Sequence, residues 1–315
     1  MSARPGPASP ASVVPPVVAV VGPTAGGKSA LAVDLALAVG GEVVNADSAQ
    51  LYRGMDIGTA KLTQAERRGV PHHLLDVLDV TQTATVAEFQ GLARKAIAAC
   101  RSRGAVPVVV GGSALYLRAV LDDIDFPGTD PAVRERLEAE LAAIGPAALH
   151  ERLRTRDPAA AAVVLPSNGR RIVRALEVGE LTGRPYRATL PAHRYAYDAV
   201  VQIGLGVPRE VLDRRIEERV AAMWAAGLVD EVRWLERAGL RAGRTASRAL
   251  GYRQVLAFLA GAYDETEARR ATVVGTRRFA RRQASWFRRD QRVRWMPWDA
   301  ADLLPRAVDA VRSVR

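Results

Sequence analysis

Short apolar runs alternate with amphipathic stretches along the first 120 residues of the chain. Residues 17–21, 42–46 and 106–110 are rich in valine, as are strands buried on both faces of a parallel sheet. Residues 30–39 and residues 85–101 have helical patterns, and Thr85-Val86-Ala87-Glu88 opens the second with a capping box. Residues 71–76, Pro71-His72-His73-Leu74-Leu75-Asp76, are expected to lead into a further short strand. This alternation predicts an α/β fold with a parallel sheet flanked by helices.

The pattern changes near residue 121, where strand signals stop. Asp130-Pro131 reads as an N-cap followed by proline at the first helical position, and the chain has helical character from there to about residue 182. Asn168 is a plausible N-cap for a helix over 169–181, which Gly183 would end. We therefore predict a helical insertion domain over residues 121–198.

After the insertion, residues 199–205 form another apolar run, which predicts a return to the sheet. Pro208 opens a long helix that Gly227 stops, and we expect helices from there to about residue 294. The core is thus predicted in two parts, 17–120 and 199–315. Residues 1–16 are rich in proline, alanine and serine and predict a disordered leader. No apolar run approaches the ~18 residues of a membrane span, so we expect a cytoplasmic protein.

The first strand runs directly into a phosphate-binding signature, Gly22-Pro23-Thr24-Ala25-Gly26-Gly27-Lys28-Ser29. It fits G-x-x-x-x-G-K-[ST] at every fixed position, with a strand before it and a helix after it. In such a loop, backbone N–H groups and a helix N-terminus hold phosphate oxygens, and the lysine adds positive charge. The hydroxyl of Ser29 can hold Mg²⁺. The sequence therefore predicts a site for a phosphate chain.

Asp47 lies at the C-terminal end of the second predicted strand, at the sheet edge where α/β proteins bind ligands. It could act as a general base beside the phosphates. A loop-capping role and an outer-shell Mg²⁺ contact remain alternatives. The strand over 106–110 ends in Gly111-Gly112-Ser113, without the carboxylate that most P-loop NTPases carry there. That absence argues against an ordinary ATPase.

A net charge of +11 predicts affinity for polyanions. Eight arginines between Arg270 and Arg292 project into a helical sector roughly 140° wide, with little acid among them. This stripe predicts contact with a nucleic-acid backbone. Arg170, Arg171 and Arg174 form a second, smaller basic cluster in the insertion. The single cysteine excludes an intramolecular disulfide.

Taken together, these segments resemble the tRNA dimethylallyltransferase (tRNA isopentenyltransferase) family. The resemblance spans nearly the whole chain, and its pieces in order are GPTAGGKS (22–29), DSAQLYRGMDIGTAK (47–61), VPHHLLD (70–76), VGGSALYL (110–117), RRIVRALEV (170–178), RIEERVAAMWAAGLVDEV (215–232), ALGYRQ (249–254) and TRRFARRQASWFRRD (276–290). It implies a P-loop NTPase-like fold and transfer of a dimethylallyl group to N6 of adenosine 37 in tRNA. It also implies that the P-loop holds the diphosphate of dimethylallyl diphosphate rather than ATP.

The resemblance also implies roles for individual residues. Asp47 corresponds to the base at N6, Thr24 to the threonine near the bridging oxygen of the donor, and Arg219 to an arginine that holds the diphosphate. The other diphosphate ligands implied are Gly22, Pro23, Ala25, Gly26, Gly27, Lys28 and Ser29, the last with Mg²⁺. The implied contacts to the tRNA anticodon stem-loop are Asp47, Ser48, Ala49, Gln50, Ser113, Arg134, Arg170, Arg171, Ile172, Val173, Arg174, Arg277, Arg278, Arg281 and Arg282.

Three other functions fit parts of the sequence. A P-loop kinase for a small metabolite would use Asp47 toward a hydroxyl group. A transferase that prenylates free adenine nucleotides would share the donor site. Neither needs the basic C-terminal third. A non-catalytic RNA-binding module would leave the P-loop and Asp47 without a role. We expect a monomer, since no exposed apolar stripe is evident.

Overall fold

A computed structural model describes residues 14–186 and 191–314. The described residues form a six-stranded sheet in the order β3-β2-β4-β1-β5-β6, with every neighbouring pair parallel. The strands are β1 Val17–Val21, β2 Gly41–Asn45, β3 His72–His73, β4 Val106–Gly111, β5 Val200–Gly206 and β6 Val293–Pro297. The predicted α/β fold with a parallel sheet flanked by helices is confirmed. The predicted leader lies almost entirely outside the described residues.

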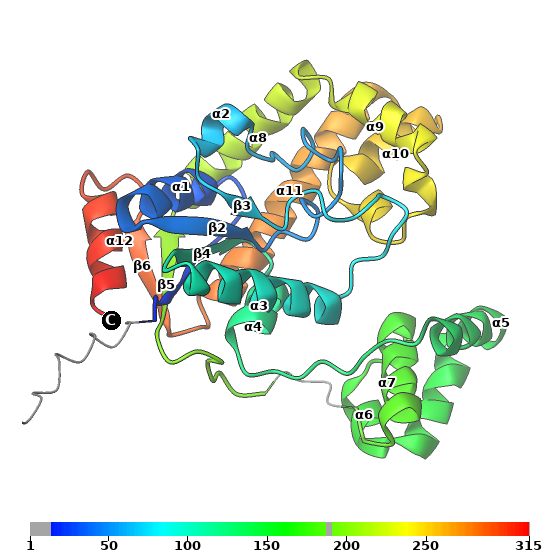
Figure 1. The fold of residues 1–315 in the computed structure, drawn as a ribbon. Coiled ribbons are helices and arrows are strands. Elements are labelled where there is room, and N and C mark those ends of the chain that lie inside the picture. The colour runs from blue at the N-terminus through cyan, green and yellow to red at the C-terminus, as the bar shows by residue number, and fades with distance from the viewer. Residues whose placement is uncertain (1–13, 187–190, 315) are drawn as a thin grey trace, which may run out of the picture. The chain divides into compact units, whose positions relative to one another are not determined.

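Helices cover both faces of the sheet (Figure 1). Successive side chains of each strand point to opposite faces, and apolar side chains on both faces are buried against these helices. Val18 and Val20 of β1 pack in one cluster with α1, Lys28–Val39, and α12, Leu303–Arg312. Ala19 and Val21 pack in the opposite cluster with α3, Val86–Ser102, and α4, Ala114–Leu121. Strands buried on both faces explain the nearly continuous valine runs of the sequence.

The chain separates into two compact units. One joins the chain up to Leu121 with the chain from Tyr195 onward, and the other spans Asp122–Arg194. The described part of the second unit has its own apolar core, which includes Leu137, Leu149 and Leu176. Its helices are α5 Pro131–Arg156, which is interrupted at Gly145, α6 Pro158–Val163 and α7 Gly169–Thr182. Asn168 caps α7, and Gly183 ends it in the left-handed conformation.

The first unit also contains a helical layer with a core of its own, in which Tyr52 and Tyr252 are buried. Most of this layer follows β5 in the chain. The remaining helices of the unit are α2 Gln64–Arg67, α8 Arg209–Ala225, α9 Leu228–Arg237, the 3₁₀ turns η1 Leu240–Ala242 and η2 Ala246–Arg248, α10 Tyr252–Leu259 and α11 Glu265–Phe287.

The prediction of helix up to about residue 294 is wrong at its end. Helix α11 stops at Phe287, and β6 follows and pairs in parallel with β5. Val293 and Met296 are the buried residues of this edge strand, while the residues between them are exposed. Because only two side chains of β6 point into the core, its hydrophobic pattern is too short to indicate a strand within an arginine-rich sequence.

Candidate active site

Three loops come together at the carboxyl edge of the sheet. β4 lies between β2 and β1, so the loop after β4 separates the P-loop from the loop that carries Asp47. In register, Gly111 of β4 faces Val21 at the end of β1, and Val110 faces Asn45 at the end of β2. The P-loop, Gly112-Ser113 and Asp47 therefore share one edge, where ligands bind in open parallel sheets.

The P-loop is shaped by residues with positive φ. Gly22 and Gly27 have φ values of 134° and 92°, and Ala25 adopts a φ of 61°, which is uncommon for a residue with a Cβ atom. The N–H of Gly26 donates to the carbonyl of Pro23 at 3.3 Å, and Lys28 Nζ donates to the same carbonyl at 2.7 Å. Because α1 begins at Lys28, its first amides lack intrahelical acceptors and can bind an anion.

Two cations belong to this site. The pKa of Lys28 is lowered to about 8, chiefly by burial; the charge of Asp47 raises this pKa and the charge of Arg219 lowers it. Burial, followed by the charge of Arg215, also lowers the pKa of Arg219. Arg219 lies on α8 and its Nη1 is 3.5 Å from the Thr24 hydroxyl oxygen. The structure thus brings Thr24, Lys28 and Arg219 together, with Asp47 near enough to Lys28 to affect its pKa.

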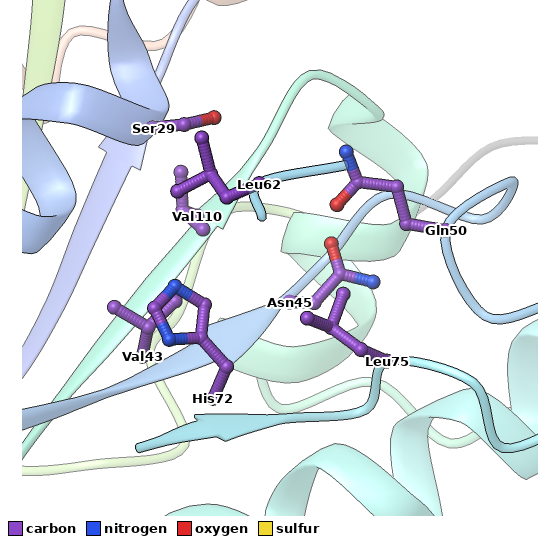
Figure 2. A pocket seen from close by; sticks show the side chains of 8 residues that line it. All are labelled: Ser29, Val43, Asn45, Gln50, Leu62, His72, Leu75 and Val110. Carbon is purple, nitrogen blue, oxygen red and sulfur yellow. The ribbon is translucent and has the colours of Figure 1, made fainter. Parts of the chain in front are cut away.

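Asp47 is held by a buried asparagine that sequence reasoning missed. The amide of Asn45 accepts from the Asp47 N–H at 3.0 Å and donates at 3.0 Å to the carbonyls of Asp47 and Leu74. The Asp47 carboxylate accepts from the Ala49 N–H at 2.9 Å. Figure 2 shows the Asn45 side chain in a small pocket that Ser29 and Gln50 also line. A polar residue at the end of the buried run Val43-Val44 was the available signal.

The other predicted residues of this edge are half-buried. Ser48, Ala49 and Gln50 follow Asp47, and Gln50 Nε2 donates to the carbonyl of Thr59 at 3.1 Å. Ser113 follows Gly112 and its carbonyl accepts from Leu117 at the start of α4. A second missed residue is Gln283, a buried side chain of α11 that bonds to Thr24 and to Gly112.

The arginine stripe is narrower than the sequence pattern indicated. Arg288, Arg289 and Arg292 lie beyond the end of α11, and Arg292 pairs with Asp290 at 2.7 Å. Arg277 is turned toward α8, where it pairs with Glu217 at 2.6 Å. The exposed arginines of α11 that line an open groove with Trp286 and Arg289 are Arg278, Arg281 and Arg282. None of these three forms a salt bridge with another described residue.

The insertion residues divide into buried and exposed ones. The side chains of Ile172 and Val173 lie in the core of the insertion, so a contact of these two residues with RNA would be made by their backbone, and it stays a prediction. Arg134 and Arg174 both pair with the buried carboxylate of Glu177. Only Arg170 and Arg171 of this predicted cluster are exposed.

Glu42, His73 and Cys100 form the one group of described residues whose donor atoms could surround a metal ion. However, Arg103 Nη2 donates to Glu42 Oε2 at 2.7 Å, which lowers the pKa of Glu42 to about 2. Burial raises the pKa of the Cys100 thiol to about 12, and the thiol donates to Glu42 Oε2 at 3.4 Å. The three side chains form a hydrogen-bonded network, in which His73 Nε2 lies 2.6 Å from Glu42 Oε2.

Comparison with known proteins identifies the family. The sequence model described as "IPP transferase" matches residues 50–290. The tRNA dimethylallyltransferase of Thermobifida fusca is 66% identical over 296 residues, which cover 92% of each chain. The solved tRNA isopentenylpyrophosphate transferase of Bacillus halodurans is 39% identical, with a TM-score of 0.70 and coverage of 95% of this chain and 97% of that chain. The chain therefore belongs to the IPP transferase family, the family of the tRNA dimethylallyltransferases.

Proposed function

We propose that this enzyme transfers a dimethylallyl group from dimethylallyl diphosphate to N6 of adenosine 37 in the anticodon loop of tRNA. The observation that carries the proposal is the meeting of a complete P-loop with Asp47 at one sheet edge, while β4, the strand between them, ends in Gly111-Gly112-Ser113. The P-loop lies beside a possible base but lacks the metal-binding carboxylate that most P-loop NTPases carry. This combination favours the diphosphate leaving group of dimethylallyl diphosphate as the ligand over ATP.

In this mechanism the bond between the allylic carbon C1 and the diphosphate oxygen breaks, and a bond from N6 to C1 forms. The exocyclic amine is a weak nucleophile, because its lone pair is delocalised into the purine. Asp47 accepts a hydrogen bond from N6 and then its proton. The charge that develops on the departing diphosphate is stabilised by Lys28, Arg219 and the loop amides.

A divalent cation fits the same site, and we propose Mg²⁺. The hydroxyl of Ser29, in the first turn of α1, would supply one oxygen ligand, and the diphosphate and water would supply others. Bound Mg²⁺ would withdraw charge from the leaving group. The remaining expectations, a monomer that acts in the cytoplasm on the anticodon stem-loop, belong to the same proposal.

Incorporation of labelled dimethylallyl diphosphate into unmodified tRNA tests the proposal. Label at A37 alone is expected, with no label in free AMP and no ATP turnover. Label in AMP instead would assign the enzyme to free nucleotides. ATP turnover without label in either acceptor would favour the kinase alternative.

The exposed face of α11 should determine the salt dependence of tRNA binding. In the variant Arg281→Ala/Arg282→Ala, we expect weaker tRNA binding and a plot of log K against log salt that is flatter by about one unit per lost phosphate contact. Filter binding at several salt concentrations measures the slope. Arg306→Ala/Arg312→Ala removes the same charge from α12 and should keep the wild-type slope. An unchanged slope in the α11 variant would remove this face from the RNA interface.

Donor affinity should fall at alkaline pH, because the pKa of Lys28 is about 8 in the free protein. The charged ammonium group of Lys28 binds the diphosphate. The affinity for dimethylallyl diphosphate is therefore highest below that pKa and falls as the pH rises through it. Well above pH 8 the Kd should rise by about tenfold per pH unit. Calorimetric titrations with dimethylallyl diphosphate from about pH 7.5, above the last ionisation of a phosphate group, measure this. Lys28→Arg stays charged and should lose the dependence; a flat wild-type profile would contradict the assignment.

A further inference from the structure

A single buried glutamine joins two of the three loops at the carboxyl edge. Gln283 of α11 is 6% exposed. Its Oε1 accepts from the Thr24 N–H at 2.9 Å, and its Nε2 donates to the Gly112 carbonyl at 2.8 Å. Both ends of the amide are thus bonded to loop backbones that lie far away in the sequence. One side chain of α11 therefore connects the P-loop to the end of β4.

The same face of α11 also contacts the P-loop through apolar atoms. Ala280, one turn before Gln283, belongs to a small buried cluster with Ala25 of the P-loop and with Leu212 and Ile216 of α8. Ala25 is the residue of the loop with the unfavourable positive φ, a conformation that persists only where the surroundings impose it. Helix α11 thus holds two successive P-loop residues, Thr24 by a hydrogen bond and Ala25 by packing.

The bond to Gln283 also determines what Thr24 can offer a ligand. Its N–H is already used, so that amide is not free to bind phosphate. Its hydroxyl remains, next to Arg219 Nη1 at 3.5 Å. We propose that Gln283 is a positioning residue, which orients Thr24 so that its hydroxyl and Arg219 face the donor diphosphate together. This inference rests on the proposed function, because it assumes that the diphosphate occupies the P-loop.

The loop after β4 is packed directly onto the glutamine amide. A Cβ atom added at Gly112 would lie 2.2 Å from Gln283 Nε2, closer than any real contact. Gly112→Ala should therefore displace the Gln283 amide without changing Gln283 itself. The contact between Gly112 and the Gln283 amide can thus be disturbed by a change in either residue. The variant Gly112→Ala leaves the sequence of α11 intact, so it separates the loss of this contact from damage to the helix.

Gln283→Met tests the proposal, because methionine keeps the length of the side chain and removes both hydrogen bonds. We expect the Kd for dimethylallyl diphosphate to rise about tenfold, because the Thr24 hydroxyl would no longer be held toward the diphosphate and a contact worth about one hydrogen bond would be lost, and we expect kcat to fall. The Kd for tRNA should stay within about twofold of wild type. Gly112→Ala should change the donor Kd in the same direction. Calorimetry, filter binding and single-turnover kinetics measure these quantities.

Thr272→Val is the matched control, since Thr272 is also a buried polar residue of α11, but its hydroxyl bonds within the helix, to the Ala268 carbonyl at 2.8 Å, and to no other residue that the structure describes. It should leave both Kd values unchanged. The inference would be overturned if Gln283→Met had the wild-type Kd for dimethylallyl diphosphate and the wild-type kcat. It would also be overturned if Thr272→Val lost as much affinity for the donor and for tRNA as Gln283→Met does. If the wild-type protein itself bound no dimethylallyl diphosphate, the proposed function would fail instead.

Discussion

Asp47→Asn should lower the single-turnover rate of dimethylallyl transfer by about 10²–10⁴-fold, the usual contribution of a general base. Asparagine keeps an oxygen that can accept from the Ala49 N–H, so the loop should hold its shape while the charge is lost. An amide cannot take the proton from N6. We expect tRNA affinity close to that of wild type, measured by filter binding on the same preparations.

Asp47→Ala removes both the charge and the contact to Ala49, and it should be at least as slow. Asp309→Ala, on the exposed side of α12, is the control for loss of a carboxylate and should have the wild-type rate. A fast Asp47→Asn enzyme combined with a slow Asp47→Ala enzyme would make Asp47 a residue that shapes the loop rather than a base.

Lys28→Met should lower kcat/KM for dimethylallyl diphosphate by about 10²–10³-fold, as loss of one preorganised donor to a developing anion does elsewhere. Methionine has similar length and no charge, so the diphosphate loses its partner in the P-loop. The hydrogen bond from Lys28 Nζ to the Pro23 carbonyl is lost as well. Steady-state kinetics with saturating tRNA measure the effect.

Lys95→Met, an exposed lysine on α3, provides the control and should leave kcat/KM unaltered. The KM for tRNA should be similar in both variants, because Lys28 lies in the donor half of the site. A Lys28→Met enzyme with normal donor kinetics would show that the P-loop does not hold the diphosphate.

The P-loop, the strand before it and Asp47 could all be predicted, because each depends on residues that are neighbours in the chain. A strand, a glycine-rich turn and a helix N-terminus make a phosphate cradle locally. Asp47 could be predicted because it follows the carboxyl end of a parallel strand. These ends all lie at the ligand-binding edge of the sheet, whatever the order of the strands. Likewise, Thr85 and Asn168 cap their helices as predicted, through contacts to residues three positions away.

A motif carried over as a block does not show which of its side chains are buried or paired within the protein. Ile172 and Val173 were grouped with their arginine neighbours, although the helical period turns them toward the core of the insertion. Arg277 was grouped with the stripe on α11, although it pairs with Glu217 of α8. Charge type alone does not reveal whether an arginine has an acidic partner on another element.

The sequence alone determined the fold class, the phosphate cradle and the candidate base, because local periodicity and short motifs encode them. Only the tertiary structure decided how the three edge loops are held together. It placed β4 between β1 and β2, and it brought Gln283 to Thr24 across 259 residues of sequence. Such contacts depend on the packing of whole elements, and neither the spacing nor the composition of the chain contains a signal for which buried amide meets which loop.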